Sequence, residues 1–541
     1  MSKKPESLFG ILNRREFVRR SGGCAALSSI SVLSTLLNLK LTASAVAAGN
    51  GGGDYKALVC LFMFGGCDTR NLLAPFNDTE HAGYVDIRQG LHYETENGVA
   101  LPRAGGDANF GGAGLLDPSD ANWGMALKPI RPKASSPNAG RDFGIHGYFN
   151  ANRNEGTTEN PGPQITATED YMRDLYNSGN MSWVCNVGSL VSPDTNISNW
   201  RQFRPVGLFS HSDEQRNWMT AMPEQQSQNI GFLGRTADIL TDTANQNSKI
   251  AMNIAMDNFN TMMTGELTLP YIINDNVDGA QEFIFNRYPS NNGPAHRDRI
   301  ISDMTDGLLT DQFANLLELS HSTSRRDAID AASEFSSAIR GVTLLTDDAG
   351  GFGPWPEHGI GRDMRQVARS IIARESLQQE RQLFFLSRGG FDNHSNLIGN
   401  HNTTLPEIGE AVYRFWKEME AQGLQDCVTL FSASDFERTY GPNSNKGTDH
   451  GWASNQFVVG GSQINGGDIL GNQPDSSNPA DFRSGGQFST DSRGRIIPSH
   501  SVDEYMFELI KWFGDFTDSD LEMILPNYSK FAGRSPIGHM A

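Results

Sequence analysis

The sequence predicts an α/β fold with a large, mostly parallel central sheet and helices on both of its faces. Three apolar runs of strand length carry this prediction: LVCLFMF at residues 58–64, LFFLS at 383–387 and VTLF at 428–431. Each run is apolar at consecutive positions, which is typical of a central parallel strand buried on both sides. Helical patterns alternate with these runs, and that alternation indicates a parallel sheet.

The other elements follow from the same periodicities along the chain. The predicted helices cover residues 168–177, 299–345, 364–374, 405–422 and 502–513, and the further strands cover 183–187 and 249–255. Within the helix at 405–422, one face is apolar at helical spacing and is assigned to the core; its residues are Ile408, Val412, Phe415, Trp416 and Met419. The three strands at 58–64, 383–387 and 428–432 are expected to be neighbours.

A further helix is predicted to open within residues 209–215. Ser212 and Gln215 have the spacing of a capping box. Ser210 and His211 then lie at or just before the positive end of this helix, where an anion is favoured. The alternative is that these residues only cap the helix.

The chain is predicted to form a single domain from residue 54 to residue 541, although 541 residues would permit more than one. Two stretches rich in Gly, Asn and Asp, at about 77–163 and 462–500, interrupt it. They show little periodicity and are expected to be long loops without a core of their own.

Composition excludes several classes of function. A net charge of −19 argues against binding to nucleic acid. Five cysteines without a C-x-x-C pair argue against a zinc ribbon or a dithiol redox motif. After the amino terminus, no run approaches the roughly 18 apolar residues that a membrane span needs, so we expect no transmembrane helix in the mature protein.

The amino terminus carries the features of an export signal. The pair Arg14-Arg15, with Phe17 two residues on, resembles a twin-arginine motif. A moderately apolar stretch follows, and Ala-Ser-Ala at 43–45 offers a cleavage site. We expect residues 1–48 to direct export by the twin-arginine machinery and to be removed, leaving a periplasmic or secreted protein. The alternative is a basic amphipathic helix of the mature chain.

Each of the three central strands is followed by a carboxylate. Asp68 follows the first, Asp392 the second and Asp435 the third, and His394 and His450 lie in the same loops. Ligands and catalytic groups gather outside the carboxyl ends of the strands in open α/β sheets. Carboxylates and imidazoles at one point are typical of a divalent-metal site, so we expect these five residues to bind zinc, calcium or magnesium.

Every one of these residues also has a plainer interpretation. Asp392 after two glycines fits an Asx-turn, and Asp435 fits a helix N-cap. His450 fits a residue that ties down a loop. The metal site is favoured because all five lie at predicted strand ends.

The chain resembles the family called domain of unknown function 1501, which in turn looks like a branch of the alkaline phosphatase and sulfatase superfamily. The resemblance covers the twin-arginine leader and most of the mature chain. The motifs that carry it are LVCLFMFGGCD at 58–68, FSH at 209–211, GFLGR at 231–235, GGFDNH at 389–394, SDF at 434–436 and GTDHGW at 447–452.

The resemblance implies an alkaline-phosphatase-like fold, divalent metals and hydrolysis of phosphate or sulfate esters. It makes Asp68, Asp392, His394, Asp435 and His450 the metal ligands. Ser210 matches the region of the nucleophile, and we assign the catalytic roles to Ser210, His211 and Arg438. Arg438 and Arg235 are candidates to clamp the substrate anion.

Three departures from the superfamily pattern matter. Phe436 stands where the phosphatases have a histidine, Asp392 and His394 are closer together than usual, and no C-x-P-x-R signature occurs. These departures argue against a two-zinc phosphatase centre and leave a single, calcium-like centre or a decayed centre open. The expected function is an exported metal-dependent hydrolase of small anionic esters. The alternatives are a non-catalytic exported binding or assembly protein that retains the fold, and a periplasmic redox-maturation partner.

Overall fold

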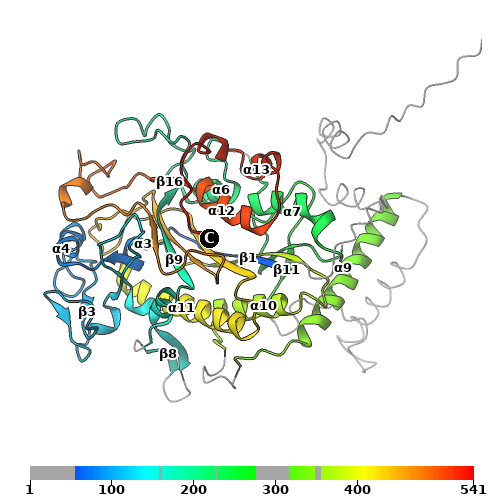
Figure 1. Ribbon diagram of the computed structural model, residues 1–541, viewed down its shortest axis with the longest axis horizontal. Coiled ribbons are helices and arrows are strands. Elements are labelled where there is room, and N and C mark those ends of the chain that lie inside the picture. Colours follow the sequence, from blue (N-terminus) through cyan, green and yellow to red (C-terminus); the bar gives the residue numbers. More distant parts are fainter. Residues whose placement is uncertain are drawn as a thin grey trace, which may run out of the picture. The chain divides into compact units, whose positions relative to one another are not determined.

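The computed structural model is shown in Figure 1. It describes residues 55–156, 161–166, 169–225, 228–247, 249–256, 258–275, 316–347 and 355–541. The expected export signal at 1–48 and the first part of the helix expected over 299–345 lie outside these residues. The chain divides into one unit of Met1–Ala47 and Ile284–Ile329 and a second of Ala48–Phe283 and Asp330–Ala541. The second unit holds the whole central sheet.

The central sheet has nine strands, and the first of them in sequence, β1, lies in its middle. Eight strands form a continuous path and β16 pairs with β9 beside it. The path runs β11 (Tyr271–Ile273), β10 (Asn253–Met256), β12 (Arg381–Arg388), β1 (Lys56–Met63), β13 (Val428–Ser434), β14 (Ser454–Val459), β9 (Met181–Gly188) and β15 (Ile469–Gly471), with β16 at His500–Ser501.

The three predicted strands are neighbours, as expected. β1 pairs in parallel with β12 on one side and with β13 on the other, so that Val59 stands opposite both Phe384 and Leu430. β14 is antiparallel to β13 and to β9. All other pairs in this sheet are parallel. The prediction of a mostly parallel sheet with helices is therefore confirmed.

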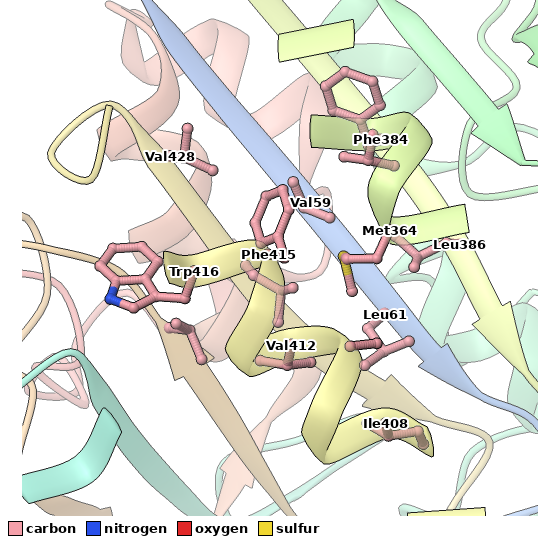
Figure 2. Packing of buried hydrophobic residues seen from close by; sticks show 14 of the residues in the cluster. Val59, Leu61, Met364, Phe384, Leu386, Ile408, Val412, Phe415, Trp416 and Val428 are labelled. Carbon is pink, nitrogen blue, oxygen red and sulfur yellow. The ribbon is translucent and has the colours of Figure 1, made fainter. Parts of the chain in front are cut away.

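One face of the sheet packs against α5 (Tyr171–Asn177), α10 (Gly359–Ile372) and α11 (Leu397–Ala421). Val59 and Leu61 of β1 point to this side because alternate residues of a strand face opposite ways. They meet Met364 of α10 and the apolar stripe of α11, including Val412 (Figure 2). All five residues of the predicted stripe of α11 are fully buried. The last part of α9 (Leu316–Arg340) adds buried residues to the same cluster.

The opposite face packs against α6 (His211–Thr220), α7 (Phe232–Ala244), α12 (Val502–Phe513) and α13 (Asp518–Ile524). Leu58, Cys60 and Phe62 of β1 belong to this cluster. Figure 1 shows α6 and α12 on one side of β1 and α10 and α11 on the other. A capping box fixes the start of α12, since Ser501 and Glu504 each accept the other's backbone N–H.

The stretch at 77–163 is more ordered than its composition indicates. With the residues just before it, it contributes a small sheet and a buried cluster that includes Phe76 and Tyr84. This cluster also takes in Tyr440 and Phe482, so the stretch shares its core with distant parts of the chain. The elements of the residues just before the stretch are α3 (Thr69–Leu72) and β2 (Leu73–Pro75). The elements from Asp78 onward are α4 (Asp78–Ile87), β3 (Arg103–Ala104), β4 (Leu115–Leu116), η1 (Trp123–Met125), β5 (Lys128–Ile130), β6 (Phe143–Ile145), η2 (Gly147–Asn150), β7 (Asn152–Gly156) and β8 (Pro161–Thr166).

The remaining elements are two short 3-10 helices, η3 (Pro479–Phe482) and η4 (Tyr528–Lys530). Among the described residues, no helix is both long enough and apolar enough to cross a membrane.

Candidate metal centre

A polar cluster lies where β1, β12 and β13 end. The loops after β12 and β13 supply Asp392, His394 and His450, and the first residue of α6 supplies His211. The turn after β1 makes this approach possible. Gly65 has a φ of +111° and lies so close to the loop after β12 that an added Cβ would be 2.5 Å from the backbone nitrogen of Asp392.

Three imidazoles converge on one carboxylate oxygen in this cluster. Asp392 Oδ1 lies 3.0 Å from His394 Nε2, 3.4 Å from His211 Nε2 and 3.5 Å from His450 Nε2. The Nε2 atoms of His394 and His450 are 3.0 Å apart. The ligand atoms of His211, Asp392 and His450 all lie within 4.8 Å of one another, a spacing that can hold a metal ion.

The other ring nitrogen of each histidine has an acceptor of its own. His450 Nδ1 lies 2.7 Å from the carbonyl oxygen of Phe209, which can only accept, so Nδ1 carries the hydrogen. His211 Nδ1 lies 2.7 Å from Asp435 Oδ2, and His394 Nδ1 lies 3.0 Å from Asp449 Oδ1. A ring with its hydrogen at Nδ1 and none at Nε2 directs the Nε2 lone pair toward Asp392. Histidine ligands of metals in proteins are usually held in this way.

Asp435 lies behind the histidines rather than beside Asp392. Its fully buried carboxylate accepts hydrogen bonds from the Gly65 amide at 3.2 Å, from Gln215 Nε2 at 2.9 Å and from His211. The structure therefore gives this predicted metal ligand the role of orienting His211. The capping box expected from Ser212 and Gln215 does not form, because Ser210 is the N-cap and makes no side-chain cap, while Gln215 reaches Asp435 instead.

Phe436 lies against the imidazoles of the cluster. Its ring centroid is 4.7 Å from that of His211 and 4.7 Å from that of His450. Phe436 thus packs against two of the three histidines.

Asp68 is not brought into the cluster. Arg88 donates two hydrogen bonds to its carboxylate, at 2.6 and 2.7 Å, and both side chains are fully buried. Burial alone would raise the pKa of Asp68, but the ion pair with Arg88 outweighs it and the pKa is lowered. Arg88 was missed because it lies in the stretch that the composition predicts to be a loop, and no local pattern links it to Asp68.

Arg438 positions Asp392. Its Nη1 donates to Asp392 Oδ1 at 2.9 Å and its Nη2 to the carbonyl of Thr448 at 2.5 Å, and its side chain is fully buried. The expected anion clamp at Arg235 is not in the site. That guanidinium donates to the backbone carbonyls of Thr220, Ile230 and Ile524.

Ser210, the expected nucleophile, is next to His211 at the start of α6. Its hydroxyl oxygen lies 3.3 Å from that of Ser212. Within the described part of the chain, no hydrogen bond joins this hydroxyl to a histidine of the cluster.

The pKa shifts of Asp392 and His450 suit cation binding, whereas the shift of His211 favours protonation of its ring. Burial would raise the pKa of Asp392, but Arg438 outweighs it and the pKa is lowered, so the carboxylate is ionised at neutral pH. Burial lowers the pKa of His450, which keeps that imidazole neutral. The hydrogen bond to Asp435 raises the pKa of His211. A pocket of about 490 Å³ opens beside the cluster, and His211, Gln215 and Asp392 form part of its wall.

The family of this chain follows from its match to a family model. A model of the family described as Protein of unknown function (DUF1501) matches residues 186–481, which is more than half of the 541 residues. The chain belongs to this family. The match to DUF1501 contains His211, Asp392, His394, Asp435 and His450, and β1 with Asp68 lies before it. No curated protein and no solved structure matches the chain.

Proposed function

We propose that this protein binds a divalent cation through His211, His394, His450 and Asp392. One observation carries the proposal: three Nε2 atoms, each on a ring whose Nδ1 faces an acceptor, lie 3.0–3.5 Å from the same oxygen of Asp392. Two imidazole lone pairs 3.0 Å apart repel each other unless a proton or a cation lies between them. His211 Nε2 is buried and has no hydrogen-bond partner, which is also the state of a ligand atom.

The donor set favours zinc among the three metals expected. Calcium and magnesium prefer oxygen ligands, whereas zinc and its first-row neighbours bind imidazole. Three imidazoles and one carboxylate fit a four-coordinate zinc site. Asp68 and Asp435 are not part of this donor set. The carboxylate of Asp68 is paired with Arg88, and the carboxylate of Asp435 is hydrogen-bonded to His211.

We infer that the reaction is hydrolysis of a phosphate or sulfate ester in an exported protein. A bound divalent ion supplies a Lewis acid that polarises the ester oxygen. The chain's own residues hold the site: Asp435 fixes His211, Arg438 fixes Asp392, and the pocket beside them gives a small ester access. The resemblance to the alkaline phosphatase and sulfatase superfamily supports this chemistry.

A non-catalytic binding protein is the second candidate, and two observations favour it. Ser210 makes no hydrogen bond to the histidines within the described residues, and Arg438 is occupied by Asp392 and a carbonyl. Such a protein would keep the metal centre for binding an anionic ligand or for stability.

The metal is tested on the mature protein and on Asp392→Asn, with Asp213→Asn as the matched control. Asp213 lies on α6 and its carboxylate pairs with Arg216, so its loss removes one charge without touching a histidine. We expect the wild type and Asp213→Asn to hold stoichiometric zinc by elemental analysis, and to melt at lower temperature after chelation. A metal ion at a free concentration a hundredfold above its Kd stabilises the folded state by about 2.7 kcal/mol. No bound metal in the wild type would reject the centre.

Ester hydrolysis is measured in the same samples with aryl phosphate and aryl sulfate. Turnover that chelation abolishes supports the hydrolase, and bound zinc without turnover supports the binding protein.

Export is tested separately with Arg14→Lys and Arg15→Lys together. We expect the precursor to stay in the cytoplasm, because the twin-arginine receptor recognises the arginine pair; normal export would contradict this.

A further inference from the structure

The pocket beside the metal centre has a wall without a cationic side chain. Apart from Asp392 and His211, its lining residues are uncharged, and they come from the turn after β1, α6, the loop after β12 and the start of α11. Arg388, next to the pocket residue Gly389, pairs with Glu407 at 2.7 Å and with the carbonyl of Gly389. A ligand group with several negative charges would therefore find no counter-charge here.

The uncharged wall offers hydrogen-bonding groups of both kinds. The hydroxyls of Thr403 and Thr404 both donate to the carbonyl of Asn400, at 2.8 and 2.9 Å, so their oxygens remain available as acceptors. The N–H groups of Gly389 and Gly390 donate to no backbone acceptor in the described part of the chain. A wall with both donors and acceptors suits a ligand whose own groups both donate and accept, and hydroxyl groups do both.

An aromatic residue also belongs to the wall. Phe64 lines the pocket, and its ring is held against Phe62 and Phe385 at centroid distances of 4.5 and 6.4 Å. A sugar ring has hydroxyls around its rim and an apolar face of C–H groups, so it uses both an aromatic surface and hydrogen-bonding groups. The volume of about 490 Å³ is that of a small-molecule site, roughly 300–1,000 Å³ in proteins.

We propose that this pocket binds a neutral sugar ring, and that the ester cleaved at the centre is a sugar phosphate or sugar sulfate. The second part of this statement rests on the proposed function, and the first part does not. The anionic group of the ester would face the metal ligands, while the uncharged ring lies along Phe64, Gly389 and the start of α11.

Gly389 provides a sharp test because its backbone accepts a side chain. A Cβ at this position meets nothing within 4 Å, and its φ lies outside the left-handed region. Gly389→Leu therefore fills the pocket without straining the fold. Gly533→Leu is the matched control, since Gly533 has the same free space and does not line the pocket. Thr403→Val is a second variant that removes one exposed hydroxyl while keeping its shape.

The probes are methyl hexopyranosides, with cyclohexanol as an apolar ring of similar size and cyclohexanecarboxylate as an anionic ring without sugar hydroxyls, each followed by ligand-observed NMR in the presence of a chelator. We expect the wild type and Gly533→Leu to bind a hexopyranoside in preference to both others. Gly389→Leu should weaken this binding by about tenfold or more through overfilling of the site, and Thr403→Val should weaken it less. Preference for cyclohexanol or cyclohexanecarboxylate, or binding that Gly389→Leu leaves unchanged, would overturn the proposal.

Zinc affinity of the same variants separates the two proposals. We expect it to be equal in all of them, because neither Gly389 nor Thr403 contacts a histidine of the centre. Sugar binding without zinc would remove the proposed function and keep the sugar site. Zinc binding and ester hydrolysis without sugar binding would keep the proposed function and overturn the sugar site.

Discussion

The half-buried His211 and the fully buried Asp435 form a pair in which the imidazole Nδ1 lies 2.7 Å from the carboxylate Oδ2. The carboxylate also accepts hydrogen bonds from the Gly65 amide and from Gln215. Three donors, one from the turn after β1 and two from α6, therefore fix one side chain, which in turn fixes the ring whose Nε2 faces Asp392. The pair links the turn after β1 and the end of β13 to the first residue of α6.

Asp435→Asn is predicted to weaken zinc binding by about 10–100-fold, the usual cost of losing a partner that orients a metal ligand. An asparagine has one acceptor oxygen, so at least one of the three donors would face its NH₂ group. Zinc affinity by calorimetric titration is the measurement, and Asp213→Asn is the control for the loss of one negative charge on this side of the protein. Equal affinities of Asp435→Asn and the wild type would show that Asp435 does not orient a ligand.

Gly65→Ala is predicted to destabilise the protein by about 1–3 kcal/mol and to lower its zinc affinity. The added Cβ would lie 2.5 Å from the nitrogen of Asp392 and 2.9 Å from the carbonyl carbon of Phe391, so the loop that carries Asp392 must move. Gly140→Ala is the matched control, because Gly140 has a φ of +81° and nothing within 4 Å of its Cβ position. Urea unfolding and zinc titration should show both variants destabilised but only Gly65→Ala impaired in binding. Wild-type affinity in Gly65→Ala would contradict the prediction.

The sequence predicted the position of the site because it follows from strand order. β12, β1 and β13 are long apolar runs that pair in parallel, so the loops after them meet at one edge of the sheet. Asp392, His394 and His450 lie in two of these loops and do come together. Predicting that these loops meet required only the hydrophobic periodicity of the strands and a general rule for α/β sheets.

The roles of individual carboxylates could not be predicted, because they depend on partners far away in the chain. Asp68 is 20 positions before Arg88, and its oxygens are engaged by that guanidinium. Asp435 is 220 positions after Gln215 and orients a histidine instead of facing the cluster. A strand-end position brings a side chain to the edge of the sheet, but its neighbours there decide what it contacts.

Asp503 is a buried carboxyl in the first turn of α12, remote in sequence from the residues of the metal centre. Asn527 Nδ2 donates to its Oδ2 at 2.8 Å, while its Oδ1 has no hydrogen-bond partner. Burial raises the pKa of Asp503 to about 7 from an ordinary value of 3.8. The folded state therefore holds a proton that the unfolded chain releases at lower pH.

Asp503→Asn is predicted to become more stable than the wild type as the pH rises from about 4 to about 7, and to keep that advantage above it. Between these values the folded wild type binds more protons than the unfolded chain, so its free energy of unfolding falls with pH. The asparagine stays neutral, and its oxygen can still accept the hydrogen bond from Asn527. A shift of three pKa units corresponds to a difference of up to about 4 kcal/mol. Urea unfolding of both proteins at several pH values measures the difference, with Asp518→Asn, an exposed aspartate in α13, as the control for lost charge. Parallel stability curves for the wild type and Asp503→Asn would show that Asp503 is ionised in the folded protein throughout this range.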